Sequence, residues 1–197
     1  NLHFFLKGAS QPEVKIVPEL DSCSFVNIGT AKLKVGASLE SDRDIVEIDI
    51  SEKGISVVEL DMSDLPDSFI SSDGFGKRTE AVDKLIADKL INAEKLVIVA
   101  PEYNGSFPGI FKTFIDAVNP KIFHGKKAAL VGAASGRAGN LRGLDHLTDI
   151  LHHLQVEVLS FKVPISKLDE MLDENGAVAN EEILEALNRQ AEMLIKF

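Results

Sequence analysis

Two short loops combine polar side chains with glycine in a way that could bind a ligand through the main chain. The first, residues 101–106, reads Pro-Glu-Tyr-Asn-Gly-Ser and directly follows the apolar run of residues 96–100. The second, residues 135–140, reads Ser-Gly-Arg-Ala-Gly-Asn and follows the apolar run of residues 128–133. Glycine and other small residues allow a ligand to approach the backbone closely. These loops are therefore the candidate site.

The first loop is the stronger of the two candidates. Proline, asparagine and glycine together exceed what a strand-to-helix corner needs, and Tyr103 is the only tyrosine in the chain. The second loop taken alone indicates a structural corner, because βαβ proteins often turn at glycine. We therefore predict that residues 101–106 have a functional role.

Other residue types that can do chemistry are predicted to be structural. His152 and His153 are adjacent on an expected helix, so they point in different directions, and no carboxylate or cysteine lies at ligand spacing. Cys23 is the only cysteine, which excludes an intramolecular disulfide and a thiolate-rich metal site within one chain. No metal site is predicted.

The elements that must position the two loops alternate between short apolar runs and stretches of helical period, the pattern of βαβ units. Strands are expected over residues 55–62, 96–100, 128–133 and 156–159. Four helices are expected, because apolar residues recur at helical spacing in four stretches of the chain. The four sets are Val82, Leu85, Ile86 and Leu90; Ile110, Phe111, Phe114, Ile115 and Val118; Leu141, Leu144, Leu147, Leu151 and Leu154; and Ile183, Leu184, Leu187, Ala191, Leu194 and Ile195. We predict an α/β fold, a three-layer αβα sandwich with a parallel sheet. Ligands of such sheets bind beyond the carboxyl ends of the strands, where both loops would lie.

The first 54 residues give a weaker pattern. Residues 25–28 are expected to form the first strand, so that residues 1–24 are an N-terminal extension and residues 25–197 form one domain. The opening residues 1–8 loosely resemble a cleavable tag, although they equally suit native sequence. Residues 31–50 are ambiguous, because their apolar residues alternate as in a strand whereas an αβα sandwich would place a helix there. We expect the helix.

Composition excludes several function classes. The chain has 21 basic and 31 acidic residues, a net charge of −10, which repels nucleic acids and anionic membrane surfaces. No apolar run approaches the roughly 20 residues that cross a bilayer. A single cysteine fits a reducing compartment, so a cytoplasmic location is expected.

The segment Pro-Glu-Tyr-Asn-Gly-Ser-Phe-Pro-Gly at residues 101–109, directly after a predicted strand, resembles the signature of the NADPH-dependent FMN reductase family. The resemblance implies a flavodoxin-like fold, a five-stranded parallel sheet of order 2-1-3-4-5, and bound FMN. It also implies that the first loop wraps the isoalloxazine ring, largely through its backbone, and that the second loop lines the other side of the flavin. The implied flavin-contacting residues are Pro101, Glu102, Tyr103, Asn104, Gly105 and Ser106 in the first loop, and Ser135, Gly136, Arg137 and Gly139 in the second.

The same resemblance places the phosphate loop after the first strand. The family has a small-residue turn followed by arginine and hydroxyl or amide donors, which hold the FMN phosphate at a helix N-terminus. Here that loop would begin at Gly29 and Thr30, with Lys32 where the family has arginine and Ser38 as a second hydroxyl donor. Residues 7–10, Lys-Gly-Ala-Ser, are an alternative, but they lie too far before the next strand.

The function implied by the resemblance is NAD(P)H-dependent reduction of FMN, followed by transfer of electrons to a quinone-like or other small acceptor, in a ping-pong reaction. Hydride transfer to a flavin needs alignment rather than a protein base, so Glu102 is expected to have a positional role. A homodimer or homotetramer is also implied. Two other functions stay open: a flavodoxin-type electron carrier, and a flavin-free binding protein with a degraded phosphate loop. The lack of tryptophan favours an open, substrate-accessible ring over the shielded ring of a carrier.

Overall fold

A computed structural model describes residues 56–73, 78–172 and 179–197 and, before residue 56, the backbone of five strands. These strands are β1 (Leu2–Phe4), β2 (Lys15–Ile16), β3 (Ser24–Thr30), β4 (Leu33–Val35) and β5 (Val46–Ile48). The strands of the larger sheet that follow are β6 (Ser56–Asp61), β7 (Lys95–Pro101), β8 (Lys127–Ala133), β9 (Glu157–Val158) and β10 (Val163–Ile165).

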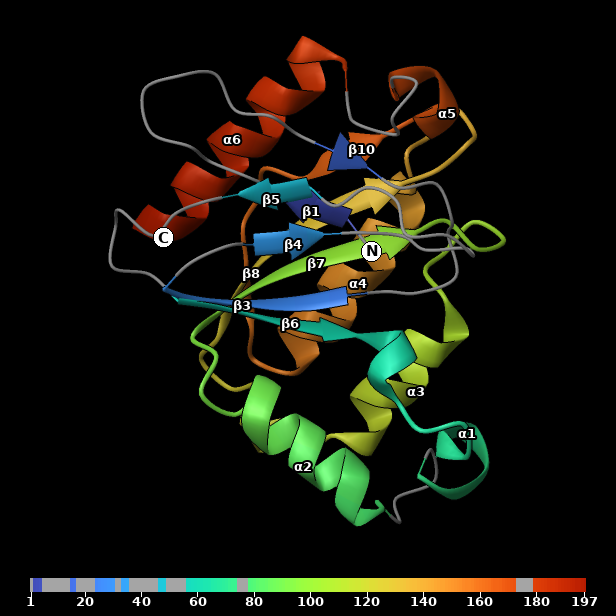
Figure 1. The fold of residues 1–197 in the computed structure, drawn as a ribbon, viewed down its shortest axis with the longest axis vertical. Coiled ribbons are helices and arrows are strands. Elements are labelled where there is room, and N and C mark those ends of the chain that lie inside the picture. The colour runs from blue at the N-terminus through green and yellow to red at the C-terminus, as the bar shows by residue number, and fades with distance from the viewer. Residues whose placement is uncertain are drawn as a thin grey trace.

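The larger sheet forms the centre of the molecule (Figure 1). Its strands follow the order β10-β8-β7-β3-β6, and β9 also pairs with β8. The strands β7, β8, β9 and β10 are parallel, whereas β3 is antiparallel to both of its neighbours, β6 and β7. The fold is thus α/β with a largely parallel sheet, as predicted.

The finer prediction of five parallel strands is wrong, because the sheet has six strands and β3 runs against the others. The order 2-1-3-4-5, predicted for an all-parallel sheet, is therefore not confirmed. The physical reason lies in the connection from β3 to β6. An antiparallel pair needs no crossover helix, whereas two adjacent parallel strands do.

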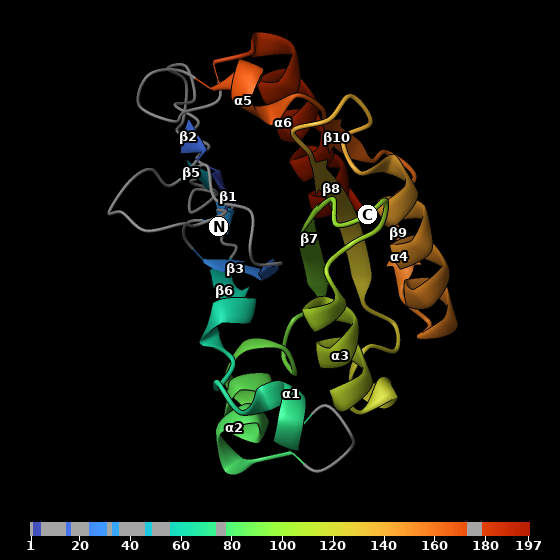
Figure 2. The same cartoon turned by 90° about the vertical axis from the view of Figure 1, so that its right-hand side faces the viewer.

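The connection contains strands in place of the expected helix. Within residues 31–50, β4 and β5 pair antiparallel with each other, and β4 pairs with β1 in a separate sheet of order β2-β1-β4-β5. At residues 33–35 and 46–48, the part of this range that the structure describes, the prediction of a helix is wrong, and the alternation of Val46 and Ile48 indicated the strand correctly. The small sheet lies on the other side of β7 and β8 from the helix α4 (Figure 2). Its β1 belongs to residues 1–24, so the predicted extension pairs with the predicted domain.

After their first residues, Lys95 and Lys127, the two central strands are apolar because both faces of the sheet are covered. In β7, Leu96, Ile98 and Ala100 pack into one core cluster, whereas Val97 and Val99 pack into a second cluster on the opposite face. In β8, Ala128 and Leu130 belong to the first cluster, and Ala129, Val131 and Ala133 belong to the second. The sheet therefore separates two cores, as a layered fold requires.

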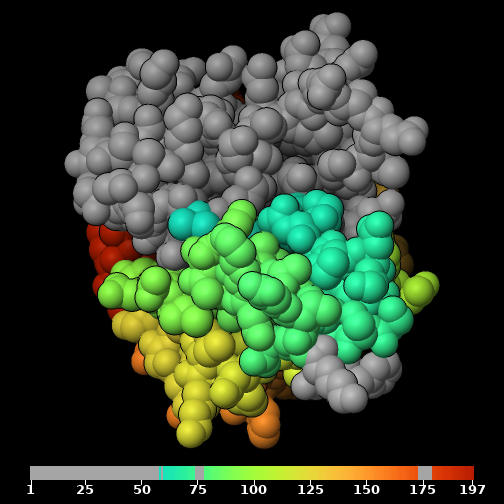
Figure 3. Space-filling model, turned by 60° about the horizontal axis from the view of Figure 1, so that its bottom comes forward, coloured from blue at the N-terminus to red at the C-terminus, as the bar shows by residue number. Residues whose placement is uncertain are grey.

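The predicted helices are confirmed. They are α2 (Glu80–Lys89), α3 (Gly109–Ala117), α4 (Leu141–His153) and α6 (Glu181–Lys196), joined by the single turns η2 (Met62–Asp64), α1 (Phe69–Ser72), η3 (Pro120–Ile122) and α5 (Leu168–Met171). Apolar residues of α2, α3 and α4 fill the first core, and those of α6 fill the second. The outer face of α2 is polar and forms part of the green surface in Figure 3. Among the described helices, none has the length and apolar character needed to span a membrane.

Candidate active site

The first loop makes a tight turn at Asn104 and Gly105. The N–H of Tyr103 donates to the oxygen of Ser106 at 2.8 Å, and the N–H of Ser106 donates back to Tyr103 at 3.0 Å. Between them Asn104 and Gly105 have positive φ angles of 52° and 80°. Positive φ at both central residues is the requirement of a type I′ turn, which Asn-Gly satisfies with little strain. The local sequence therefore fixes the shape of this loop.

The start of the loop is fixed by the sheet. Pro101 is buried at the end of β7, opposite Ala133 at the end of β8, and the N–H of Glu102 donates to the oxygen of Ala133 at 2.8 Å. The two candidate loops therefore leave adjacent parallel strands at the same edge, as predicted.

The second loop lies against the segment that follows β10. The N–H of Lys167 donates to the oxygen of Gly136 at 2.8 Å, and the N–H of Leu168 donates to the oxygen of Ala134 at 3.0 Å. Gly139 is buried with a φ of 55°, and a Cβ atom there would lie 2.7 Å from Pro164. A side chain would not fit at that distance, so Gly139 allows the loop to pack closely on β10.

Glu102 connects the two loops. One carboxylate oxygen of Glu102 accepts the N–H of Asn140 at 3.2 Å, and the other lies 3.7 Å from Nη2 of Arg142. The buried side chain of Asn140 donates in turn to the oxygens of Ala100 and Pro101, at 2.9 and 3.1 Å. The start of α4 is thus tied to the end of β7. These contacts give Glu102 a structural part in holding the loops together.

A pocket of about 390 Å³ lies between the loops. Its lining comes from both: Glu102, Asn104 and Gly105 from the first, and Ala134, Ser135, Gly136, Arg137 and Ala138 from the second. Six of the predicted residues therefore meet in one pocket. Its volume falls within the range of small-molecule sites, roughly 300–1,000 Å³.

Four predicted residues lie beside this pocket without lining it. Pro101 and Gly139 are buried and set the positions of the two loops. Tyr103 is half-buried and pairs with Ser106 through the main chain. The hydroxyl of Ser106 lies 2.9 Å from Nδ1 of His146, on the second turn of α4.

The sequence did not identify several residues that shape the site. Ala134 and Ala138 line the pocket, and Arg142 lies against Gly105, where a Cβ would come within 2.9 Å of its Nη2 atom. Asn140 and His146 hold the first loop through side-chain contacts. Arg142 and His146 are four residues apart and so share one face of α4. That spacing was the only sequence signal that could have linked them to the loop.

Two residues of the predicted phosphate loop, Gly29 and Thr30, lie at the other edge of the sheet from the pocket. Ser24, at the start of β3, lies opposite Val99, and Asn27 lies opposite Leu96, so Gly29 and Thr30 extend past the amino end of β7. The pocket lies at the carboxyl ends of β7 and β8, the other edge of the sheet. The antiparallel direction of β3 places Gly29 and Thr30 away from the pocket, and phosphate binding by these residues stays a prediction. Lys32 and Ser38 lie outside the described residues.

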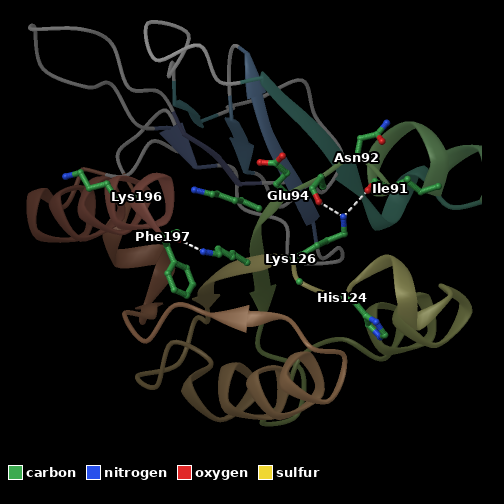
Figure 4. Close-up of a pocket in the computed structure, with 11 residues that line it drawn as sticks. Ile91, Asn92, Glu94, His124, Lys126, Lys196 and Phe197 are labelled. Carbon is green, nitrogen blue, oxygen red and sulfur yellow. Dashed lines mark hydrogen bonds between the residues drawn. The ribbon is translucent and has the colours of Figure 1, made fainter.

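A larger cavity, of about 540 Å³, lies at that amino edge and is lined by four lysines, Lys95, Lys126, Lys127 and Lys196 (Figure 4). Three of these ammonium groups bond to main-chain oxygens. Lys126 donates to Ile91 at 3.0 Å and also to Ala93, Lys95 donates to Leu194 and Ile195 at 3.0 and 2.7 Å, and Lys127 donates to Phe197.

These lysines stabilise the ends of elements. The last carbonyls of a helix lack partners within the helix, and lysine side chains commonly bond to them. Lys126 is buried, and burial lowers its pKa, an effect that nearby Glu94 opposes. These contacts with main-chain oxygens therefore explain why lysines line the cavity.

The pocket between the two loops suits the ring of a flavin. Five of its eight lining residues are glycine, alanine or serine, and the turn at Asn104 and Gly105 forms part of its wall. Main-chain donors can bond to a planar heterocycle without the loss of side-chain entropy. The residues at the pocket therefore fit the ring part of FMN, whereas Gly29 and Thr30 lie at the other edge of the sheet.

Comparison with known sequences identifies a protein family. Residues 44–168 match the profile of a family described as NADPH-dependent FMN reductase. The matched range begins after β3 and contains both loops, together with the start of α4.

Curated relatives and a solved structure extend the comparison. The chain is 30% identical over 145 residues to an NAD(P)H-dependent FMN reductase from Pseudomonas aeruginosa, covering 72% of this chain and 77% of that protein. It is 28% identical over 128 residues to a 2-hydroxy-1,4-benzoquinone reductase from a Burkholderia species, covering 62% and 68%. The fold is similar to a flavoenzyme NAD(P)H:acceptor oxidoreductase from Paracoccus denitrificans, with a TM-score of 0.56, 24% identity, and coverage of 68% of this chain and 75% of that one. The profile match over more than half of the chain, with the 30% identical relative, shows that the chain belongs to the NADPH-dependent FMN reductase family.

Proposed function

We propose that this chain is an FMN-dependent oxidoreductase that takes a hydride from NADPH or NADH and reduces quinone-like or other small acceptors. The observation that carries the proposal is the pocket of about 390 Å³ between the loops of residues 101–106 and 135–140. The named activities of the relatives, FMN reduction and benzoquinone reduction, support this class of reaction.

The two loops would hold the flavin ring through main-chain groups. FMN, when bound, accepts a hydride from the nicotinamide and passes electrons to the acceptor. The turn at Asn104 and Gly105 would support one side of the ring, with Tyr103 beside it, and residues 135–137 would line the other. The protein thus contributes alignment and main-chain donors, which stabilise charge that develops on the ring.

Glu102 would position the loops rather than transfer a proton. Both of its carboxylate oxygens already face donors, the N–H of Asn140 and the guanidinium of Arg142. Hydride transfer to a flavin requires no protein base. Replacement of Glu102 would therefore affect binding of the flavin more than its chemistry.

An open pocket suits two substrates that react in turn. Residues 135–138 are exposed, and Asn104 is exposed at the tip of the first loop. A donor and an acceptor could then use the same face of the ring in succession, as a ping-pong reaction requires. An electron carrier, in contrast, would gain from a shielded ring.

We propose further that residues 25–197 form the flavin-binding unit and that the chain acts as a homodimer or homotetramer in the cytoplasm. The family membership supports the assembly, because a second subunit could close the exposed edge of the pocket. The single cysteine supports the reducing compartment.

An absorbance experiment tests the proposed function. Purified protein with added FMN should show a perturbed flavin spectrum. In the absence of oxygen, about one equivalent of NADPH or NADH should bleach the flavin absorbance, and addition of a quinone should restore it. A flavin that only a chemical reductant bleaches would identify an electron carrier. A spectrum equal to that of free FMN would identify a flavin-free binding protein.

A further inference from the structure

The turn at Asn104 and Gly105 has the sequence Asn-Gly, which is chemically labile as well as favourable for a type I′ turn. The main-chain nitrogen after an asparagine can attack the side-chain amide, and glycine hinders this attack least because it has no Cβ atom. Asparagine is one of the thermolabile residues that thermophilic proteins avoid. Asn104 is therefore a candidate site of spontaneous modification.

Both reacting groups at this turn are free. Asn104 is exposed, and its side chain makes no hydrogen bond or ion pair with any residue that the structure describes. The N–H of Gly105 has no acceptor in the described part of the chain either, whereas the N–H groups of Tyr103 and Ser106 on each side are bonded. No contact of the folded protein therefore competes with the attack.

The closed turn restrains the reaction without preventing it. Two main-chain hydrogen bonds between Tyr103 and Ser106, at 2.8 and 3.0 Å, hold the turn, and the hydroxyl of Ser106 lies 2.9 Å from His146. Exposed loop tips open locally at a small cost in free energy, while the sheet stays folded. We therefore expect the folded protein to react more slowly than the unfolded chain.

The reaction needs only water. The nitrogen of Gly105 forms a bond to Cγ of Asn104, the bond from Cγ to the side-chain nitrogen breaks, and that nitrogen leaves as ammonia with the proton from Gly105. Water then opens the resulting five-membered imide at either carbonyl. One opening gives aspartate, and the other gives isoaspartate, in which the main chain runs through the Cβ atom.

Isoaspartate would change the wall of the pocket that Asn104 and Gly105 line. It adds a carbon atom to the main chain inside a two-residue turn, whose geometry depends on the number of atoms between its ends. It also adds a carboxylate to a pocket that Glu102 already lines. Aspartate adds the charge alone.

We propose that Asn104 is a deamidation site, that isoaspartate there disables the pocket, and that a bound flavin slows the reaction. The last two statements rest on the proposed function, because they require a flavin against the turn. A ligand that binds the closed turn lowers the population of the open, reactive form. The protein without flavin is thus open to a chemical inactivation from which the loaded protein is protected.

An ageing experiment followed by peptide mass analysis tests the proposal. Protein without flavin, protein with saturating FMN and the urea-unfolded chain are kept at one mildly alkaline pH, and aspartate and isoaspartate are measured at Asn104 and Asn175. Asn175 is also followed by glycine and lies outside both loops, so it is the internal reference for the effect of FMN. The variant Asn104→Asp supplies the aspartate product.

Isoaspartate should accumulate at Asn104 in the folded protein without flavin. The isoaspartate fraction should bind FMN at least about tenfold more weakly than the parent, whereas Asn104→Asp should lose less affinity. FMN should slow the reaction at Asn104 and leave that at Asn175 unchanged.

Three results would overturn the proposal. They are an intact Asn104 in the folded protein after a time that converts it in the unfolded chain, an isoaspartate fraction with the affinity of the parent, and equal slowing of both sites by FMN. An equal loss of affinity in Asn104→Asp would overturn the role given to the longer main chain. A parent protein that binds no FMN would reject the proposed function, while isoaspartate at Asn104 would still support the modification.

Discussion

Gly105 is the residue at which the candidate site is most sensitive to substitution. Its φ of 80° disfavours any side chain, and a Cβ atom would lie 2.9 Å from Nη2 of Arg142. Gly105→Val should therefore distort the turn beside Asn104, costing about 1–3 kcal/mol of stability and lowering flavin affinity at least tenfold. Fluorescence titration with FMN measures the affinity, and thermal unfolding measures the stability.

Gly125→Val is the matched control for this prediction. Gly125 has a similar φ of 75°, with open space where a Cβ would lie, and it belongs to the opposite edge of the sheet. The control should lose comparable stability and keep its affinity for FMN. Equal affinities in both variants would mean that the turn at Gly105 does not contact the flavin.

At the scale of elements, Asn140 fastens the start of α4 to the end of β7. Its amide donates to the oxygens of Ala100 and Pro101, and it adopts a left-handed φ of 63° that asparagine tolerates better than alanine. Asn140→Ala should lower the free energy of unfolding by about 2–4 kcal/mol, because two buried acceptors lose their donor. Urea unfolding measures this change.

Asn180→Ala provides the comparison for Asn140→Ala. Asn180 caps α6, where its side chain accepts the N–H of Ile183 at 3.0 Å, and loss of such a cap costs about 1 kcal/mol. If Asn140→Ala is no more destabilising than Asn180→Ala, the link between α4 and β7 is not the contact that sets the geometry of the pocket.

Acid stability should depend on the segment between α1 and α2. The hydroxyl of Ser72 donates to Asp73 at 2.6 Å, and the N–H of Thr79 donates to its other oxygen, so the pKa of Asp73 lies below its ordinary value of 3.8. A depressed pKa in the folded state adds stability above pH 3.8, which is lost as the pH falls below that value. Asp73→Asn should unfold with a weaker pH dependence in acid than the parent. The same dependence in Asp73→Asn and the parent would contradict this role, and Asp67→Asn, an exposed carboxylate on the preceding turn, serves as the control.

The elements that sequence predicted well are those whose own residues decide their structure. The apolar runs of β7 and β8 are buried, and so are most residues of the predicted helical stripes of α3 and α4, with Leu141 as an exposed exception. For residues 31–50 we predicted a helix because the expected fold has one there, although their apolar residues alternate as in a strand. The structure has the strands β4 and β5 within this segment. The turn at Asn104 and Gly105 follows from local chemistry. Arg142 and Asn140 escaped prediction because their roles depend on tertiary contacts with Glu102 and β7.

At the scale of the whole molecule, the pocket has one open side, since residues 135–138 are exposed in a single chain. A second subunit could cover that side, and we expect sedimentation velocity to show a dimer or tetramer at micromolar concentration. A monomer at that concentration would contradict the proposed assembly.

The central claim is that the flavin lies between the two loops at the carboxyl edge of the sheet. A crystal structure of the protein with FMN tests it most directly. We expect density for the isoalloxazine ring between residues 102–105 and 134–138. Density for FMN in the lysine-lined cavity beside Lys126 and Phe197, with the pocket between the loops empty, would contradict it.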